Sequence, residues 1–535
     1  MTPRHAGAMA PLFSLRSSKS WGIGEIADLP LFAPWLAAAG FDRLMLLPIN
    51  TVGGGETSPY AAASTMAIDP IYIALRAVPD FLYAGGVDAL SADARIALAI
   101  ADRSSAIRYD AVRRVKREAL SIAFAQFADD EWAQLTTRGA ALAAYIARER
   151  WWLDDYALFM AIADATPATS WRQWPDAIRR RDPKVLDEAR RHLSREVLRH
   201  QYLQWIADSQ WQAARATTAA HGVALMGDLP FVARTDSADV WARPDEFFLD
   251  VSAGVPPDAF SDTGQDWGLP TYHWAAIAAT DYAWMRRRAR RMADLFDGIR
   301  IDHLVGLYRT FGRPPDGEPF FNPDGEAAQT SQGEILLGIF RDTGAALVAE
   351  DLGTVPDFVR VSLARVGVPG SKVLRWERHY DLPGQPFIEP RLYPAASAAM
   401  TGTHDTEPLA MWWDTLGVAD RAQVLALEAC STRGLDDPLM SWTDSLRDAL
   451  IGATFHSAST DVFLPIQDLF GWRDRINTPG TVGAHNWTWT LPWAVDRWAA
   501  LPETRARAEW LSALAVACRR AGKEASAKSE SQGEE

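Results

Sequence analysis

The sequence predicts an α/β protein with a (β/α)₈ barrel, the TIM-barrel fold, and three observations lead to this prediction. Eight short apolar runs recur along the chain, and such runs are typical of strands buried on both faces of a parallel sheet. Amphipathic stretches lie between several of the runs. Several of the runs carry a polar or acidic residue at or near their end. A doubly wound open sheet is the alternative, but it seldom needs eight such units. The expected strands are Ala10–Leu15, Arg43–Ile49, Val223–Pro230, Asp297–Asp302, Ala346–Leu352, Ser371–Trp376, Met400–Asp405 and Thr460–Gln467.

Amphipathic stretches between these runs predict the barrel helices. In each of them apolar residues recur at three- and four-residue spacing, which places them on one face of a helix. That face is expected to cover the sheet. The predicted helices are Leu29–Ala39, Trp284–Leu295, Gln332–Thr343 and Val355–Val366.

The second and third runs are separated by a long segment that we expect to be mainly helical. Residues 51–221 contain three stretches of helical periodicity with little proline. We expect a helical subdomain inserted between strands 2 and 3, with residues 9–50 holding the first two strands and residues 222–515 the rest of the barrel. The three helical stretches are Asp93–Phe127, Trp132–Ala165 and Val185–His221.

Two other segments have an unusual composition. Arg234–Thr280 is rich in Gly, Pro, Asp and Trp and shows no clear period. Long irregular segments in compact domains are usually functional, which draws attention to residues 252–268 within it. Residues 521–535 are rich in Lys, Glu, Ser and Gln, so we expect a disordered tail.

Composition limits the class of partner and the compartment. The net charge of −14 disfavours non-specific binding to nucleic acid or to an anionic membrane. The chain has no uncharged apolar stretch of membrane-spanning length, and its first residues lack a secretory signal, so we expect a cytoplasmic protein. Cys430 and Cys518 are too few for a disulfide framework or a thiolate metal site, although one disulfide between them stays open.

Tryptophan is unusually frequent. The chain has 23 Trp against 21 Phe and 12 Tyr, although Trp is usually the rarest of the three. An indole stacks on the apolar face of a sugar while its N–H donates a hydrogen bond. For any single Trp, packing in the core is the simpler interpretation. The excess as a whole favours a carbohydrate ligand.

Acidic residues end several predicted strands, where a barrel has its active-site face. If they converge, they could bind a hard cation such as Mg²⁺ or Ca²⁺, or they could cleave a glycosidic bond. One such carboxylate alone is more often a helix N-cap or an ion-pair partner. The residues are Asp228, Asp302, Glu350, Asp351 and Asp405.

Two of these strand ends carry further chemical groups. Along a strand, alternation sends Arg300 and Asp302 to the same face, with His303 at the end of the strand. An arginine beside a carboxylate lowers its pKa and keeps it ionised, as a nucleophile requires. His404 and Asp405 would place an imidazole and an acceptor at the same height.

The sequence around these residues resembles that of the 4-α-glucanotransferases of the amylomaltase, or disproportionating-enzyme, type in the α-amylase clan. The similar segments follow one another in order from Trp21 to Trp489, nearly the whole chain. They are GIRIDH (298–303), VAEDLG (348–353), TGTHD (401–405), WGIG (21–24), LP (47–48), SPY (58–60), GDLP (227–230), DSADVW (236–241), AGVPPD (253–258), GQDWG (264–268) and RINTPG (475–480).

The resemblance implies a role for each matching residue. Asp302 would be the nucleophile, Glu350 the general acid/base, and Asp405 the stabiliser of the oxocarbenium-like transition state. Residues 252–268 would form a loop that shields the intermediate from water. No cofactor and no metal are implied, the partners would be maltooligosaccharides or α-glucans, and the protein would be a monomer or a weak homo-oligomer. The implied substrate-binding residues are Ser58, Tyr60, Asp228, Gln265, Trp267, Arg300, His303, Asp351, His404 and Asn477.

Three departures from the family pattern stand near these segments. Thr406, Glu407 and Pro408 follow TGTHD where the family usually has Asn-Asp-Thr. Ala259 stands where an aromatic residue is common. Arg375-Trp376 replaces residues that are often uncharged and aromatic.

Three hypotheses of function follow. The first is a 4-α-glucanotransferase that moves α-1,4-glucan segments by a retaining double displacement. The second is a hydrolase of the same clan, in which water is the acceptor. The third is a non-catalytic glucan-binding protein, which would not need Asp302, Glu350 and Asp405 together.

Overall fold

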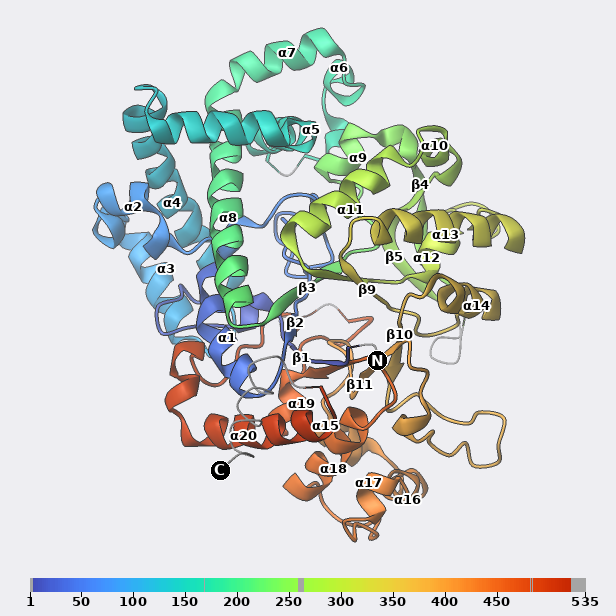
Figure 1. Ribbon diagram of the computed structural model, residues 1–535. Coiled ribbons are helices and arrows are strands. Elements are labelled where there is room, and N and C mark those ends of the chain that lie inside the picture. Colours follow the sequence, from blue (N-terminus) through green and yellow to red (C-terminus); the bar gives the residue numbers. More distant parts are fainter. Residues whose placement is uncertain (1–2, 168, 258–263, 482, 484, 521–535) are drawn as a thin grey trace.

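A computed structural model describes residues 3–167, 169–257, 264–481, 483 and 485–520, and it contains a closed barrel of eight parallel strands. The strands follow one another around the barrel in the order β1-β12-β11-β10-β9-β6-β3-β2 (Figure 1). This confirms the predicted fold class. The strands are β1 (His5–Met9), β2 (Arg43–Met45), β3 (Ala224–Leu229), β6 (Gly298–Ile301), β9 (Ala346–Ala349), β10 (Gly370–Val373), β11 (Ser397–Met400) and β12 (Asp461–Pro465).

The prediction of the first strand is wrong. Ala10–Leu15 is buried but forms no strand, and Pro11 within it lacks the N–H that a ladder needs. The barrel instead begins with β1, before the boundary that we set at residue 9. The small residues of β1 give little hydrophobic signal. They allow close packing, because a Cβ on Gly7 would lie 2.6 Å from the carbonyl oxygen of Arg43.

The seventh strand also lies earlier than expected. Of the run Met400–Asp405, only Met400 belongs to β11, and residues 401–405 form a loop beyond the strand. The interior of the barrel is filled by a separate cluster of side chains, several of them methionines. This cluster consists of Met9, Met45, Met226, Val348, Val373, Ala398, Met400 and Phe463.

Helices cover the outside of the barrel, and the four predicted barrel helices are present. Their bounds agree with the prediction to within a few residues, except that the third begins six residues earlier, at Glu326. A C-terminal helix packs beside the first one. The helices are α1 (Leu29–Ala38), α11 (Ala283–Leu295), α12 (Val305–Tyr308), α13 (Glu326–Arg341), α14 (Asp357–Val366), α19 (Ile466–Phe470) and α20 (Pro502–Ala517).

Between β2 and β3 the chain forms seven α-helices in the part that the structure describes. They are α2 (Pro79–Tyr83), α3 (Ala92–Arg103), α4 (Tyr109–Phe127), α5 (Thr137–Ala165), α6 (Asp176–Arg179), α7 (Pro183–His192) and α8 (Ser194–Ala220).

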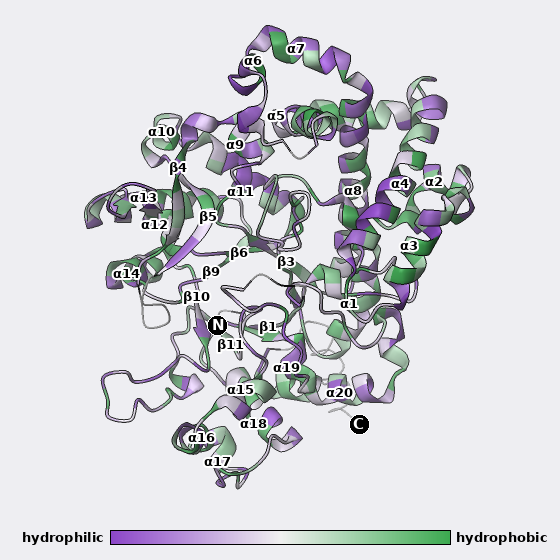
Figure 2. Cartoon of the chain, turned by 180° about the vertical axis from the view of Figure 1, so that it is seen from behind, coloured by the Kyte–Doolittle hydropathy of each residue, from purple (hydrophilic) through white to green (hydrophobic). Residues whose placement is uncertain are grey.

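One helix predicted here is divided, and another belongs partly to the barrel. The stretch Asp93–Phe127 forms α3 and α4, because the N–H of Ile107 donates to the carbonyl of Thr488 (2.8 Å) and interrupts the helix. The long helix α8 contacts α5 at one end and α1 and β3 at the other (Figure 1). A single unit over residues 51–221 therefore stays a prediction. Hydrophobic and hydrophilic residues both occur along α4 and α8 (Figure 2).

Arg234–Thr280 is not irregular, which corrects our interpretation of that segment. It forms two strands of an antiparallel sheet with the order β5-β4-β7-β8. The pairing of β4 with β5 shifts register between Phe248 and Ser252 and again between Ser252 and Gly254, so no simple alternation marks the strands in the sequence. The elements are α9 (Ala238–Ala242), β4 (Phe247–Val255), β5 (Gln265–Tyr272), α10 (Trp274–Ala279), β7 (Thr310–Arg313) and β8 (Phe320–Asn322).

A small helical group between β11 and β12 has its own apolar cluster, which includes Trp412, Trp413 and Leu450. The helices are α15 (Leu409–Thr415), α16 (Val418–Leu425), α17 (Glu428–Ser431) and α18 (Asp444–Phe455).

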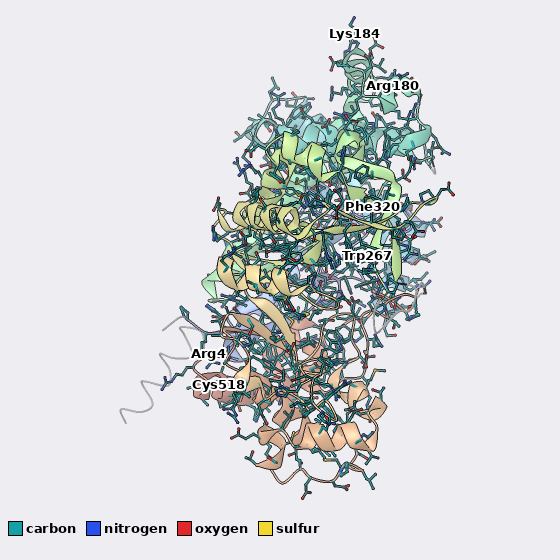
Figure 3. All side chains as sticks on the ribbon, turned by 90° about the vertical axis from the view of Figure 1, so that its right-hand side faces the viewer. Arg4, Arg180, Lys184, Trp267, Phe320 and Cys518 are labelled. Carbon is teal, nitrogen blue, oxygen red and sulfur yellow. The ribbon has the colours of Figure 1, made fainter. Side chains whose placement is uncertain are left out.

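The two ends of the described chain lie together, far from the inserted helices α6 and α7. The Arg4 side chain donates to the carbonyl of Cys518 (3.2 Å), whereas Arg180 and Lys184 lie at the far end of the molecule (Figure 3). Cys430 and Cys518 are both buried, and neither forms a disulfide. In the described residues, no helix combines the length and the apolarity needed to cross a membrane. The expected tail, 521–535, lies outside the described residues.

Candidate active site

Neighbouring barrel strands bring the predicted polar residues to one end of the barrel. In the parallel register, Asp228 on β3 pairs with Arg300 on β6, and Arg300 pairs with Val348 on β9. Asp302 and Glu350 follow β6 and β9 directly. The strands therefore end side by side, and their terminal side chains share one site, as in a barrel with its site at the carboxyl ends of the strands.

Arg300 is the centre of this cluster. Its Nη1 donates to both carboxylate oxygens of Asp228 (2.7 Å each) and to Oδ1 of Asp302 (3.0 Å). The guanidinium is buried, and the carboxylates around it outweigh that burial and raise its pKa. Burial raises the pKa of Asp302 to about 6, although Arg300 opposes this shift. Asp302 is thus a partly buried carboxyl group that ionises near neutral pH beside a buried cation.

Glu350 is held by backbone N–H groups. Its Oε2 accepts from the N–H of His303 (2.8 Å), and its Oε1 accepts from the N–H of Leu352 (3.1 Å). His303 has φ 45°, in the left-handed region that bulky residues rarely adopt, at a cost of about 1–3 kcal/mol. Burial raises the pKa of Glu350 to about 7, and the neighbouring Asp302 adds to the shift. The side chain of His303 stays neutral, because burial lowers its pKa to about 4.

Asp405 has a different environment. Its Oδ1 accepts from Nδ2 of Asn477 (2.6 Å), and its Oδ2 lies 3.3 Å from Nε2 of His404. Burial opposes ionisation of Asp405, but His404 and Asn477 outweigh it and lower the pKa to about 2. Burial also disfavours charge on His404, but Asp405 raises the pKa of this ring. Asp405 is therefore ionised at every pH of interest.

Aromatic rings form two walls of the site. Tyr60 stacks on His404 with 5.2 Å between ring centroids and 22° between planes, and its OH donates to Oδ2 of Asp228 (2.7 Å). Trp487 lies 5.9 Å from both of these rings. Trp267, on β5, meets His303 edge to face at 4.7 Å. The antiparallel sheet thus places the side chain of Trp267 beside the carboxyl end of the barrel.

Three predicted binding residues have other contacts. Asp351 is buried, and its Oδ1 accepts from the N–H of Ser371 (2.7 Å) at β10. Gly370 makes room for this carboxylate, because a Cβ there would lie 2.7 Å from it. Ser58 holds the turn before the aromatic wall by accepting from the N–H of Tyr60 (3.4 Å). Gln265 is exposed and accepts from Trp267 Nε1 (3.1 Å).

Sequence reasoning missed several residues of the site. Phe231 contacts both His303 (5.3 Å) and Trp267 (6.4 Å) by ring edges, and it directly follows the segment GDLP. Nothing in the sequence marks Trp487 as a site residue except the general excess of Trp. Arg475 opens the segment RINTPG, and its Nη2 donates to the carbonyl of Asp405 (2.7 Å). Ala259 lies outside the described residues, so its departure from the family pattern has no structural outcome.

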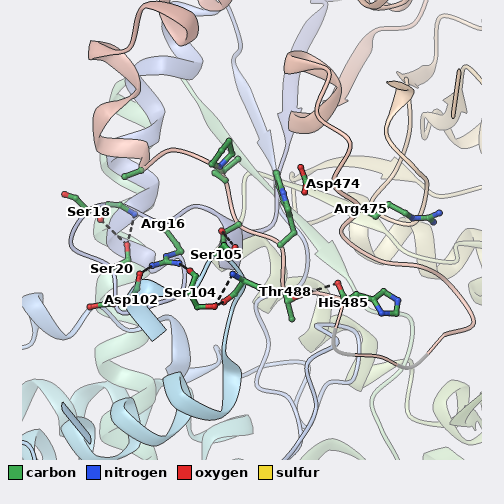
Figure 4. Close-up of a pocket in the computed structure, with 17 residues that line it drawn as sticks. Arg16, Ser18, Ser20, Asp102, Ser104, Ser105, Asp474, Arg475, His485 and Thr488 are labelled. Atoms are coloured by element: carbon green, nitrogen blue, oxygen red, sulfur yellow. Dashed lines mark hydrogen bonds between the residues drawn. The ribbon is translucent and has the colours of Figure 1, made fainter. Parts of the chain in front are cut away.

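A polar cavity of about 810 Å³ lies next to this cluster rather than within it. Its lining includes Arg475, Arg16, Ser104 and Trp489 (Figure 4). Asp302, Glu350 and Asp405 do not line it. Arg475 thus faces the cavity while it contacts the loop of Asp405. Among the described residues, no group of three or more His, Cys, Asp or Glu side chains is arranged to hold a metal ion.

Comparisons with known proteins agree with this geometry. A family model described as 4-alpha-glucanotransferase matches residues 10–495. A 4-alpha-glucanotransferase of Thermus thermophilus is 32% identical over 489 residues, which cover 88% of this chain and 92% of that protein. One of Synechocystis sp. is 32% identical over 484 residues, with 88% and 90% covered.

A solved structure supports the same assignment. The amylomaltase from Streptococcus agalactiae, in complex with acarbose, superposes with a TM-score of 0.80 at 25% identity. The similarity covers 97% of this chain and 100% of that one. Since the family model and the similar proteins cover nearly the whole chain, this chain belongs to the 4-alpha-glucanotransferase family.

Proposed function

We propose that the protein transfers α-1,4-glucan segments from a donor maltooligosaccharide to another maltooligosaccharide or to glucose, with retention of configuration. Family membership supports the transfer activity. One observation supports the mechanism: two partly buried carboxyl groups at the barrel end have raised pKa values, about 6 for Asp302 and about 7 for Glu350. Between these values the first is ionised and the second protonated, as a nucleophile and a general acid require.

The proposed reaction has two steps. The carboxylate of Asp302 attacks the anomeric carbon, and the glycosidic bond breaks as Glu350 gives its proton to the departing sugar oxygen. The glucan is then an ester of Asp302, and Glu350 is ionised. In the second step Glu350 takes the proton of an acceptor 4-hydroxyl, whose oxygen displaces Asp302. Asp405, ionised throughout, stabilises the positive charge that develops on the sugar ring in both steps.

Transfer requires that a sugar hydroxyl reach the ester before water does. We propose that the described parts of the segment 252–268, residues 252–257 and 264–268, help to shield the ester from water; residues 258–263 lie outside the described residues. The contact of Trp267 with His303 supports this placement. Water is far more concentrated than any sugar, so its exclusion decides between transferase and hydrolase.

Incubation with maltotriose tests transfer against hydrolysis. We expect glucose and a ladder of longer maltooligosaccharides, with little gain in total reducing ends, because each transfer conserves the number of glycosidic bonds. Only maltose and glucose, with rising reducing ends, would establish a hydrolase. No reaction with maltotriose or longer glucans would favour the non-catalytic alternative.

The pH dependence follows from the two carboxyl groups. We expect kcat/KM to rise with pH through about 6, as Asp302 loses its proton, and to fall through about 7, as Glu350 loses the proton that it must donate. An α-glucosyl fluoride donor provides the control, because its leaving group needs no acid. With that donor the alkaline fall of ester formation should disappear. A fall that persists would mean that Glu350 is not the acid.

Tyr60 contributes a ring and a hydroxyl that two substitutions separate. Tyr60→Ala removes the stacking surface and the hydrogen bond to Asp228, so we expect kcat/KM to fall by about 10- to 100-fold. Tyr60→Phe keeps the ring and should lose about tenfold or less. Initial rates with maltotriose measure both. A Tyr60→Ala loss as large as that of Asp302→Asn would show that Tyr60 takes part in the chemistry.

We also propose a cytoplasmic location and a monomeric or weakly associating state. The two buried free cysteines support a reducing compartment. Sedimentation at several protein concentrations would measure the association, and a stable oligomer at low concentration would contradict it.

A further inference from the structure

Two departures from the family pattern meet in the folded protein. Arg375 follows β10 and Glu407 follows the loop of Asp405, so they stand on neighbouring strand ends. Nη2 of Arg375 donates to the carbonyl oxygen of Glu407 (2.7 Å), and Nη1 lies 3.5 Å from its Oε1. The two unusual residues are therefore an ion pair.

Glu407 also contacts a second arginine. Its Oε2 lies 3.4 Å from Nη1 of Arg475. Arg475 in turn donates from Nη2 to the carbonyl of Asp405 (2.7 Å) and from Nε to the carbonyl of Asn477 (3.1 Å). We call these three side chains the Arg375–Glu407–Arg475 bridge. It joins β10 to the backbone of both residues that make the short Asp405–Asn477 hydrogen bond.

The bridge is largely shielded from solvent on the Arg375 side. The Arg375 side chain is 4% exposed and lies over the ring of Trp412, whereas Glu407 is 26% exposed. Nε of Arg375 is buried and has no hydrogen-bond partner among the described residues. Asp468 is the other carboxylate near Arg375, but Thr401 and the N–H of Leu409 already bind its oxygens. Glu407 is thus the carboxylate that pairs directly with Arg375.

The loop that carries Asp405 is closed by its own hydrogen bonds. The Thr406 hydroxyl accepts from the N–H of Thr403 (3.0 Å) and donates to its carbonyl (3.1 Å), which closes the turn 403–406. A Cβ on Gly402 would lie 2.6 Å from that hydroxyl, so the tight turn depends on glycine. Within the bridge, Arg475 connects this closed turn to Asn477 by binding the carbonyls of Asp405 and Asn477.

We propose that Glu407 is a positioning residue, which through Arg375 and Arg475 holds Asp405 and Asn477 in the geometry that the transition state needs. Glu407 does not touch substrate in this scheme. The proposal rests on the role proposed above for Asp405. Misplacing a group that acts mainly in the transition state lowers kcat, while the binding of the donor is largely unchanged.

The test compares isosteric substitutions. Glu407→Gln should lower kcat by about 10- to 100-fold with KM changed less than about threefold, because a shift of about 1 Å in a catalytic group has an effect of that size. Asp414→Asn is the matched control. It is the same chemical change on the nearby helix α15, at an exposed residue that pairs with Arg473. It should leave kcat and KM unchanged.

A double-mutant cycle separates positioning from general damage. Arg375→Gln should lower kcat as Glu407→Gln does, and the double variant should lose little more than either single one, because both break the same bridge. Strictly multiplicative losses, or a Glu407→Gln kcat within twofold of the parent in folded protein, would overturn the proposal. An equal rise of KM would also overturn it. Failure of the role of Asp405 is distinguishable, since Asp405→Asn itself would then keep its activity.

Discussion

Asp302→Asn is expected to lower both transfer and hydrolysis by about 10⁴- to 10⁶-fold, the scale seen when a covalent nucleophile is removed. The amide has nearly the same shape as the carboxylate but cannot attack the anomeric carbon. Its neighbour Arg300 keeps two hydrogen bonds to Asp228, so the guanidinium still has a carboxylate partner. Initial rates with maltotriose, measured as glucose release and as product ladder, test this expectation.

Two controls make the Asp302 result decisive. Asp250→Asn makes the same change at an exposed carboxylate that pairs with Arg172, and it should keep the parent rate. The thermal midpoint of Asp302→Asn should not fall, because Arg300 keeps its hydrogen bonds to Asp228 and because the raised pKa of Asp302 means that the fold disfavours its ionised form. Turnover within tenfold of the parent would show that another group is the nucleophile, and loss of folding would be visible as a lowered midpoint.

Glu350→Gln is expected to lower the turnover rate with maltotriose by about 10²- to 10⁴-fold, the usual contribution of general acid–base catalysis. The amide cannot protonate the departing sugar or deprotonate the acceptor. An α-maltosyl fluoride bypasses the first requirement, because fluoride leaves without a proton. The ester on Asp302 should therefore form and then persist, since its release also needs Glu350.

Mass spectrometry of the intact protein and of its peptides measures this trapped ester. We expect an added maltosyl unit on the peptide that contains Asp302, and none in the double variant that also carries Asp302→Asn. Added azide is a small anion that needs no base, and it should release the ester as glycosyl azide. If the label lies on another residue, or if no label forms while the fluoride is consumed, the two-step mechanism through Asp302 is wrong.

Two of the three catalytic candidates, Asp302 and Glu350, were predictable from sequence because each directly follows a strand. A residue that follows a buried strand of a parallel barrel must lie at the same end as its counterparts, so Asp228, Asp302 and Glu350 were brought together by topology alone. The closed barrel confirms that topology. Seven of the eight strands were located from their apolar runs, one of them several residues too late, and the first was missed because alanine and glycine carry little hydrophobic signal.

Asp351 illustrates a limit of the same reasoning. Successive residues of an extended backbone tend to point to opposite sides, so the position of Glu350 at the site does not by itself place Asp351 there. In the structure, the Asp351 carboxylate accepts a hydrogen bond from the N–H of Ser371. The bulged hairpin of β4 and β5 was invisible for a related reason, because its register shifts erase the alternation by which strands are recognised.

The sequence alone determined the fold class and the family, and it identified the candidate carboxylates, because buried strands and short ordered segments are local patterns. Only the tertiary structure decided whether these carboxylates are ionised and which residues hold them in place. Whether a carboxyl group is charged depends on burial and on partners distant in sequence, as with Glu350 and Asp405. The pairing of Arg375 with Glu407 is also a tertiary fact, since 32 residues separate them in the chain. Charge and position at the site arise from long-range contacts, which no local pattern specifies.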